Sequence, residues 1–174
     1  MKESIIGSKT ILRSHRNEDA DFFTYWFNQP KVMFQCGFIE KTTKEQELAS
    51  LNKIETDCDW YTITDLSDRI IGEAGLLRIN PQWFCTDMTM IIPDPNDQGK
   101  GYGKDAGKLL LSRAFNHYKL NRVSIGVVAL NTPAVKYWES LGFIKEGIQE
   151  QGYYYNGKFS DFIMMRVLKN EFAE

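Results

Sequence analysis

The chain has 174 residues, of which 43% are hydrophobic and 25% charged, and this length suits one domain with a single core. Its 21 basic and 23 acidic side chains leave a formal charge of −2, so the chain has no overall basic field to attract nucleic acid. No apolar run approaches the length that crosses a membrane, and the first residues lack the apolar segment of a signal peptide.

The first third of the chain predicts one strand and two helices. The strand covers residues 9–13, and Asn17 is positioned to cap a helix over residues 18–27. That helix carries too many aromatic side chains for one narrow face, so we expect it to be buried on two sides or to line a pocket. The stretch TTKE at residues 42–45 matches a capping box and begins a second helix that ends near residue 53.

The middle of the chain predicts strands joined by tight turns. Residues 60–64, 69–79 and 83–92 have strand character, and the turn residues between them favour antiparallel hairpins. The stretch DQGKGYGKDAGKLL, residues 97–110, then begins a helix that continues to about Tyr118. Ala106, Leu110, Ala114 and Tyr118 share one face of this helix, which predicts contact with the core.

The last third predicts a buried strand, a helix and a hairpin. The strand is residues 122–130, and Thr132-Pro133 begins a helix that Gly142 ends. Two strands over residues 143–155 and 158–168 flank an Asn-Gly turn. The sum is an α+β (mixed α/β) fold: a central, mostly antiparallel sheet flanked by helices, with no domain boundary within residues 1–174.

The cysteines predict neither disulfides nor a metal site. Cys36, Cys58 and Cys85 are odd in number and outside CxxC spacing, and His15 and His117 are the chain's two histidines. This pattern disfavours structural zinc, so we expect no metal. We interpret the cysteines as reduced thiols of a cytoplasmic protein.

Three phosphate-binding interpretations of the glycine stretch can be compared. A Walker loop fails because Gly103-Lys104 is followed by Asp105 rather than Ser or Thr. A dinucleotide fingerprint has acceptable spacing from Gly101, but no parallel βαβ unit precedes it. The third is a pyrophosphate loop, in which backbone N–H groups and a helix dipole face an anion beside Lys100 and Lys104. A solvated turn with lysines for solubility remains the alternative.

Three segments carry a resemblance to a known family. QGKGYG at residues 98–103 resembles the Q/R-x-x-G-x-G/A motif of the GNAT superfamily of N-acetyltransferases. NTPAVKYWESLGFIKEG at residues 131–147 resembles a later segment of that superfamily, in which an Asn precedes a helix ending in Leu-Gly-Phe. YYYNGKFSDFIMMRVL at residues 153–168 resembles the tail of the branch with ribosomal-protein and spermidine N-acetyltransferases.

The resemblance implies a GNAT-like domain over residues 1–174 that uses acetyl-CoA as cosubstrate. It further implies transfer of the acetyl group to a primary amine by direct attack in a ternary complex. A strand ending at Ile91 and Ile92 would splay from its neighbour, and its main chain would hold the pantetheine arm and the thioester. The implied cofactor-binding residues are Ile91, Ile92, Gln98, Gly99, Lys100, Gly101, Tyr102, Gly103, Lys104, Asn131, Ala134 and Trp138. Asn131 has an alternative role in its own turn.

The catalytic groups are open at this stage. Asp87 occupies the position where relatives often carry a glutamate base, and Glu73 on the preceding strand is the second candidate. Trp138 stands where many relatives have the tyrosine that protonates the leaving thiolate, and an indole is no usable acid. Tyr137, one residue away, or water would then supply this proton.

For the site that binds the acceptor amine, the sequence offers candidate residues but no motif. Its candidate lining is Tyr25, Trp26, Phe34, Trp60 and residues 153–155, and the acids Glu45, Glu47, Glu55, Asp57 and Asp59 are concentrated in one stretch. Clustered acids would suit a polyamine, whereas a solvated helix face explains most of them equally. The partner is expected to be a small amine, a polyamine or a peptide N-terminus, with no nucleic acid and no membrane, and a homodimer is left open. A non-catalytic acetyl-CoA sensor is the alternative function.

Overall fold

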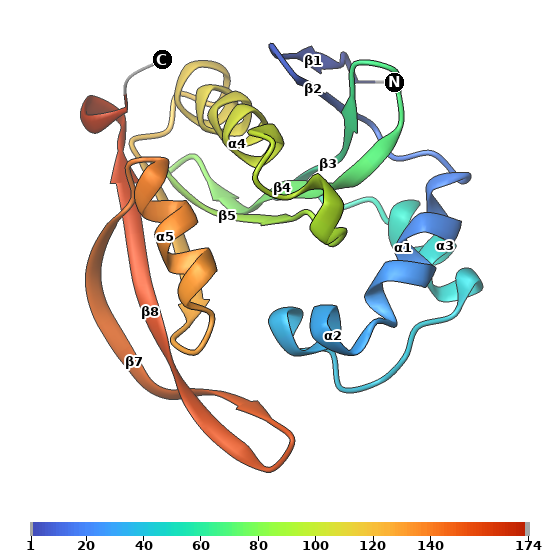
Figure 1. Ribbon diagram of the computed structural model, residues 1–174. Coiled ribbons are helices and arrows are strands. Elements are labelled where there is room, and N and C mark those ends of the chain that lie inside the picture. The colour runs from blue at the N-terminus through green and yellow to red at the C-terminus, as the bar shows by residue number, and fades with distance from the viewer. Residues whose placement is uncertain (1, 173–174) are drawn as a thin grey trace.

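One eight-stranded sheet runs through residues 2–172, the part of the chain that the computed structural model describes (Figure 1). The strands are β1 (Ile5–Ile6), β2 (Thr10–Arg13), β3 (Asp59–Asp65), β4 (Ile70–Asn80), β5 (Cys85–Ile91), β6 (Arg122–Val128), β7 (Ile144–Tyr155) and β8 (Lys158–Leu168). Their spatial order is β1-β2-β3-β4-β5-β6-β8-β7, and every neighbouring pair is antiparallel except β5–β6. The mixed fold with a mostly antiparallel sheet is confirmed.

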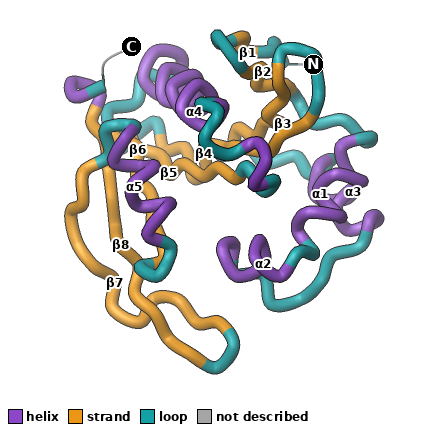
Figure 2. The backbone as a smooth tube through the Cα atoms, viewed as in Figure 1, coloured by secondary structure: helices purple, strands orange, loops and turns teal. Residues whose placement is uncertain are grey.

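Helices cover the sheet from two sides. They are α1 (Asp19–Phe27), α2 (Pro30–Cys36), α3 (Lys44–Leu51), α4 (Tyr102–Ser112) and α5 (Thr132–Ser140), with short turns η1 (Pro95–Asp97), η2 (Arg113–His117) and η3 (Lys169–Glu171). Figure 2 shows α4 on one side of β4 and β5 and α2 on the other, with α1 and α3 beside α2. Among residues 2–172, no helix is both long enough and apolar enough to span a bilayer.

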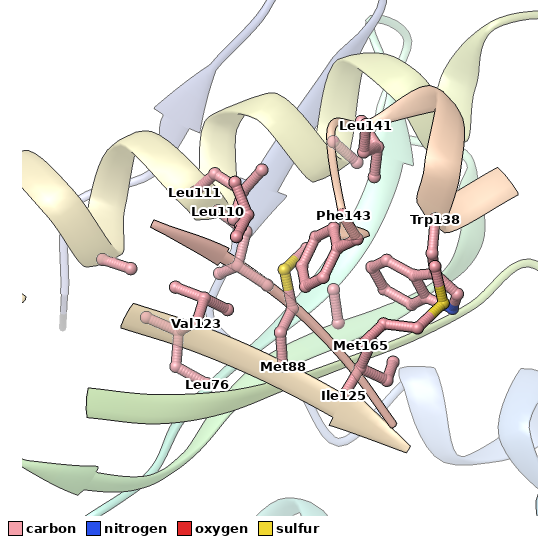
Figure 3. Packing of buried hydrophobic residues seen from close by; sticks show 14 of the residues in the cluster. Leu76, Met88, Leu110, Leu111, Val123, Ile125, Trp138, Leu141, Phe143 and Met165 are labelled. Carbon is pink, nitrogen blue, oxygen red and sulfur yellow. The ribbon is translucent and has the colours of Figure 1, made fainter. Parts of the chain in front are cut away.

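The main core lies between α4, α5 and the sheet. Ala106 and Leu110 of α4 and Ala114 of the following η2 are fully buried, and Tyr118 packs half-buried against the same core, which confirms the predicted apolar face. Figure 3 shows Leu110 and Leu111 beside side chains from β4, β5 and β6, with Trp138 and Phe143 at the α5 end. α4 contains two glycines, which lower its intrinsic helix propensity. The helix therefore depends on the burial of its apolar face, which also holds it against the sheet.

The sheet splits between β5 and β6, which form the only parallel pair among the described strands. Residues 85–87 of β5 pair with residues 122–124 of β6, and beyond Asp87 the two strands separate. β5 continues to pair with β4 up to Ile91, while β6 continues with β8 up to Val128. The splay that the resemblance implied is therefore present, and it opens a wedge in the middle of the sheet.

Two local predictions near the N-terminus need correction, and one helix was not predicted. α1 begins at Asp19 without a side-chain cap, and Asn17 instead accepts a hydrogen bond from the Asn52 amide, 3.0 Å away. The capping box on Thr43 closes with Gln46 and not with Glu45. The short helix α2, which begins at a proline and ends before a left-handed glycine, was not predicted.

The long β7–β8 hairpin turns at Asn156 and Gly157, both with positive φ, as a two-residue turn requires. The end of the hairpin next to this turn reaches across to α2. The Tyr153 hydroxyl donates a hydrogen bond of 2.6 Å to the Phe34 carbonyl, and the rings of Phe34 and Tyr155 pack edge to face at 5.3 Å. These contacts join the two halves of the molecule on either side of the wedge.

Candidate active site

The wedge between β5 and β6 contains a cavity of about 800 Å³, here called the large cleft. Its walls include residues 89–91 of β5 with the following Ile92, residues 125–128 of β6, the glycine stretch before α4, and α5. Of the cofactor-binding residues predicted from the sequence, those that line it are Ile91, Ile92, Gln98, Gly99, Gly101, Gly103, Lys104, Asn131, Ala134 and Trp138. Lys100 instead lies 3.6 Å from Asp97, and Tyr102 packs against the main core.

The glycine stretch forms an exposed helix start that faces the large cleft. Gly99 and Gly101 have φ of +75° and +88°, which side chains other than glycine adopt at a cost. A Cβ on Gly101 would also lie 2.9 Å from the Nζ of Lys9, which donates to the Lys100 carbonyl at 2.8 Å. The first helical hydrogen bond runs from Asp105 to Gly101, so the N–H groups of residues 102–104 have no intrahelical acceptor. These N–H groups, at the positive end of the helix dipole, are suited to bind an anion.

An ion pair with a buried aspartate and a side-chain hydrogen bond hold this stretch in place. Both oxygens of Asp97 accept hydrogen bonds from the Arg69 guanidinium, at 2.8 and 2.9 Å, and these bonds lower the pKa of Asp97. The next residue, Gln98, donates its amide to the Ile92 carbonyl at 2.9 Å. The end of β5 and the glycine stretch are therefore one unit.

The end of β5 is also pressed closely against β4. A Cβ on Gly72 would lie 2.1 Å from the Ile91 carbonyl oxygen, so only glycine is compatible with this approach of the two chains. The main chain of Ile91 is thereby fixed at the wall of the large cleft, where the resemblance placed a main-chain contact with the cosubstrate.

A second cavity, of about 410 Å³, lies on the α1–α3 side of the sheet and is called the acidic pocket here. Four carboxylates line it: Glu40, Glu47, Glu55 and Glu73. His15 and Lys53 are further polar residues of its wall, and Lys53 forms an ion pair with Glu55. Phe27, Phe38, Trp60 and Glu73 line both cavities, so the acidic pocket and the large cleft meet at these four side chains.

Glu73 stands at this junction. It lies on β4, opposite Thr62 of β3 on one side and Ile91 of β5 on the other. Its side chain keeps some contact with the cavities but is shielded from bulk water. Burial, and secondarily the charge of Glu47, raise the pKa of Glu73 from 4.5 to about 8. A carboxyl group that exchanges its proton near neutral pH is suited to general base catalysis.

Asp87 is placed differently from Glu73. It lies at the closed end of the wedge, in the last pair before β5 and β6 separate. Its carboxylate accepts a hydrogen bond of 2.7 Å from Arg78, and it is not among the residues that line either cavity. Of the two carboxylates considered from the sequence, Glu73 is the one that faces the cavities.

Tyr137 and Trp138 both line the large cleft. The Tyr137 hydroxyl donates to the Gly103 carbonyl at 2.8 Å and lies 3.1 Å from the sulfur of Met90, and burial raises its pKa. A Cβ on Gly103 or Gly107 would lie within 3.1 Å of this ring, so both glycines make room for it. The Trp138 indole is buried and packs edge to face on Phe143 at 5.2 Å.

Asn131 begins α5 as its N-cap. Its side-chain oxygen accepts a hydrogen bond of 3.3 Å from the Ala134 N–H, and the residue also lines the large cleft. The capping role is therefore present, and the contact with a cofactor stays a prediction.

The acceptor-side predictions are met in part. Trp60 lines both cavities and Tyr153 lines the large cleft, whereas Tyr25 and Tyr154 are mostly exposed. Glu47 and Glu55 belong to the acidic pocket, but Asp59 is buried elsewhere, where it binds Lys2, Tyr61, Arg113 and Tyr118.

Two wall residues of the acidic pocket were missed in the sequence. Glu40 lies in the loop between α2 and α3, and His15 follows β2, so no periodic pattern marks either. The three cysteines are free thiols. Within residues 2–172, no group of three or more His, Cys, Asp or Glu side chains is arranged to hold a metal ion.

The split sheet, the glycine-bearing helix start and the cavity between them are the architecture of an acyltransferase. The chain belongs to the GNAT family, since the family model described as an acetyltransferase (GNAT) domain matches residues 9–144. The family resemblance stated from the sequence is thus confirmed. Acetyl-CoA, the expected cosubstrate, is consistent with this membership.

Similar proteins extend over most of the chain. The probable N-acetyltransferase YjcK of Bacillus subtilis is 30% identical over 88% of this chain and 84% of its own length. The spermidine N(1)-acetyltransferase of Vibrio cholerae is 24% identical over 90% of this chain and 85% of its own. A crystal structure of spermidine N-acetyltransferase from Vibrio cholerae, in complex with CoA and spermine, has a TM-score of 0.85 at 23% identity. It covers 94% of this chain and 98% of that one, which shows a common fold.

Proposed function

We propose that this protein transfers the acetyl group of acetyl-CoA to a primary amine of a small cationic molecule, with a polyamine as the leading candidate. The observation that carries this proposal is the meeting of two cavities at Glu73, one with an anion-binding helix start and the other with four carboxylates. The two substrates would bind together, and the amine would attack directly in a ternary complex.

Acetyl-CoA fits the residues of the large cleft. The backbone N–H groups at the start of α4, with Lys104 and Lys9 beside them, would hold the pyrophosphate. The main chain of Ile91 and Ile92 would hold the pantetheine arm, with Asn131, Ala134 and Trp138 on the opposite wall. The cosubstrate supplies an acetyl group activated as a thioester.

The acidic pocket supports a cationic acceptor. Glu40, Glu47 and Glu55 place negative charge beyond Glu73, and Lys53 offsets only part of it. Ammonium groups are attracted to such a site, whereas an uncharged amine or a carboxylate-bearing acceptor gains less. The relatives named as spermidine acetyltransferases add support for a polyamine rather than a peptide N-terminus.

Glu73 is the proposed general base. A free alkylammonium has a pKa of about 10, so its proton must be removed before the nitrogen can attack. Glu73, with its pKa raised to about 8, accepts that proton directly or through a water molecule. Asp87 has no part in this proposal because it lines neither cavity and its carboxylate accepts a hydrogen bond from Arg78. The leaving thiolate takes its proton from Tyr137 or from water.

The acceptor is tested with a panel that contains spermidine, a monoamine, an amino acid ester and a short peptide, with release of free CoA thiol as the readout. We expect turnover with spermidine and a KM for it that rises in Glu47→Gln, while KM for acetyl-CoA is unchanged. A matched control is Glu45→Gln, which lies on the same helix outside the acidic pocket. Turnover with the peptide alone would overturn the polyamine proposal, and acetyl-CoA binding without any turnover would favour the non-catalytic sensor.

A further inference from the structure

A chain of three buried or half-buried polar groups runs from α1 through β3 to the acidic pocket. The Asp19 carboxylate is fully enclosed and accepts two hydrogen bonds from Arg13, at 2.7 and 2.8 Å, and one from the Arg16 N–H. The Thr62 hydroxyl lies 2.6 Å from the same carboxylate. The Nδ1 of His15 lies 2.8 Å from that hydroxyl oxygen.

The protons along this chain can be assigned from chemistry. Burial alone would raise the pKa of Asp19, but the bonds from Arg13, Thr62 and Arg16 lower it overall, so Asp19 is an ionised acceptor. The single hydroxyl proton of Thr62 must therefore point to Asp19. The Thr62 oxygen is then left as an acceptor, and His15 Nδ1 must carry the proton that is donated to it.

This assignment leaves the second ring nitrogen with a lone pair. The two ring nitrogens of an imidazole point in nearly opposite directions, so Nε2 points away from Thr62 and the sheet. His15 lines the acidic pocket, and the hydrogen bond to Thr62 is the one that its ring makes among the described residues. Its other neighbour is the Phe23 ring, edge to face at 6.1 Å.

The position of His15 relative to Glu73 follows from the strand register. Thr62 pairs directly with Glu73, so their side chains are neighbours on one face of the sheet. Glu73 lines both cavities, whereas His15 lines the acidic pocket only. His15 thus lies on the acceptor side of Glu73, one step farther from the large cleft.

We propose that His15 is a specificity-determining residue, whose Nε2 accepts a hydrogen bond from a second nitrogen of the acceptor, beyond the amine that reacts at Glu73. The inference rests on the proposed function for the identity of the reacting amine. It deepens that function by assigning a neutral, directional contact to a pocket whose other ionisable wall residues are four glutamates and Lys53. An acceptor with two nitrogens would satisfy it, and a monoamine would not.

The surroundings keep this contact neutral. Burial, together with the charges of Lys2 and Arg13, lowers the pKa of His15 to about 4, although Asp19 favours the charged ring. At neutral pH the imidazole is therefore uncharged. A protonated ring would repel an ammonium group and would have no lone pair to offer.

The kinetic test compares 1,4-diaminobutane with n-butylamine as acceptors. For His15→Phe, which keeps a ring but removes the acceptor nitrogen, we expect KM for the diamine to rise about tenfold, as the loss of one hydrogen bond predicts. KM for butylamine and for acetyl-CoA should stay within about twofold, because neither depends on that bond. An equal rise for diamine and monoamine would overturn the proposal.

Thr62 provides the matched pair of variants. Thr62→Val removes the hydroxyl that selects the tautomer and should raise KM for the diamine, while Thr62→Ser keeps the hydroxyl and should behave like the parent protein. A purely structural role of Thr62 would affect both acceptors alike, which would count against the proposal.

Nitrogen-15 NMR of the histidine ring tests the assignment without any activity. In the parent protein we expect a protonated Nδ1 and a bare Nε2 for His15, and a shift of the Nε2 resonance when 1,4-diaminobutane is added. A protonated Nε2, or no shift at saturating diamine, would overturn the inference. If no amine is acetylated but the shift occurs, the proposed function fails and the contact of His15 stands.

Discussion

Glu73 shows how burial at a single position in the sheet changes the acidity of a carboxyl group. Its neighbours on both sides are strand residues, so its carboxyl group is shielded from bulk water and its ionised form is disfavoured. Glu47 adds a like charge. The resulting pKa of about 8 suits a general base that works near neutral pH. Part of the Glu73 side chains are then deprotonated, and the carboxylate is basic enough to accept a proton.

This pKa predicts the pH dependence of the reaction. Because the pKa is raised to about 8, Glu73 is mostly protonated at pH 6 and ionised at pH 9, so kcat/KM should climb through pH 8. In Glu73→Gln we expect kcat/KM to fall by about 10²- to 10³-fold and this ascending limb to vanish. The profile is measured at fixed ionic strength, with Asp87→Asn as the control. Loss of the limb in Asp87→Asn and not in Glu73→Gln would reverse the assignment.

Tyr137 gives a second prediction at this scale. Tyr137 lines the large cleft, and its hydroxyl donates a hydrogen bond to a carbonyl of the cleft wall. In the family that the chain resembles, the proton donor stands one position later, where this chain has Trp138. We expect Tyr137→Phe to lower kcat about tenfold or more with KM for acetyl-CoA unchanged, if its hydroxyl serves the leaving group. Trp138→Phe is the comparison. It shrinks a buried ring, so we expect a lower Tm with little change in kcat. Unchanged kcat in Tyr137→Phe would leave water as the proton donor.

At the scale of elements, the start of α4 depends on its attachment to the N-terminal strand. Asp105, in the first turn of α4, accepts hydrogen bonds from the backbone of residues 8, 9 and 10 and from the hydroxyls of Ser8 and Thr10. These bonds outweigh the opposing effect of burial and lower the pKa of Asp105 to about 2. The glycine stretch is thereby anchored on the side opposite the large cleft.

Asp105 should therefore contribute to acid stability. A carboxyl group whose folded-state pKa is depressed stabilises the protein above its ordinary pKa of 3.8, and this stability is lost as the pH falls toward about 2. We expect Asp105→Ala to lower the free energy of unfolding by about 2 kcal/mol at pH 7 and by less at pH 3. Urea titrations at both pH values measure this, with the mostly exposed Asp21→Ala as control. An equal loss at both pH values would contradict the assignment.

The glycine stretch itself predicts a coupled loss of fold and affinity. Gly101→Val places a branched side chain at φ +88° and against Lys9, where about 1–3 kcal/mol of strain is expected. We expect acetyl-CoA affinity, measured by calorimetry, to fall at least about tenfold, because the backbone N–H groups would no longer be presented to the phosphates. Gly147→Val is the control, since a Cβ there meets no atom within 4 Å. Unchanged affinity in a folded Gly101→Val would remove the anion site from this loop.

The elements differ in how well the sequence predicts them. Strands β3 to β5 and the β7–β8 hairpin are marked by turn residues, and α4 by glycine and an apolar stripe, so these follow from local chemistry. α2 has helix boundary residues but only seven residues between them, too few for a periodic signal. The position of Asp87 relative to the split does not follow from the sequence for a different reason. Where β5 separates from β6 depends on tertiary pairing, and no local pattern shows that Asp87 precedes that point.

The acidic pocket shows the same limit for side chains. Glu47 and Glu55 belong to an acidic stretch that is visible in the sequence, but a solvated helix face explains such a stretch equally. Glu40 and His15 come from loops on either side of α1 and α2, and only the fold brings them beside Glu73. In this chain, sequence motifs predicted the walls of the large cleft better than those of the acidic pocket.

At the scale of the whole molecule, the split sheet joins two binding regions that belong to different helical layers. α4 and α5 flank the large cleft, whereas α1 and α3 supply the wall of the acidic pocket on the other side of the strands. The cavities meet where β4 borders the wedge, and Tyr153 on β7–β8 holds α2 across it. Under the proposed function, a sheet without the split would separate the two substrates, so the proposal depends on the separation of β5 from β6 beyond Asp87.

The central claim is that an amine in the acidic pocket reaches the acetyl group at Glu73. Its most direct test is the initial rate of acetylspermidine formation from acetyl-CoA and spermidine, followed by mass spectrometry, in the parent protein, Glu73→Gln and Asp87→Asn. We expect acetylspermidine with the parent protein and Asp87→Asn, and a rate at least about 10²-fold lower with Glu73→Gln at unchanged acetyl-CoA affinity. Equal rates in the parent protein and Glu73→Gln, or no acetylated amine from a parent protein that binds acetyl-CoA, would contradict it.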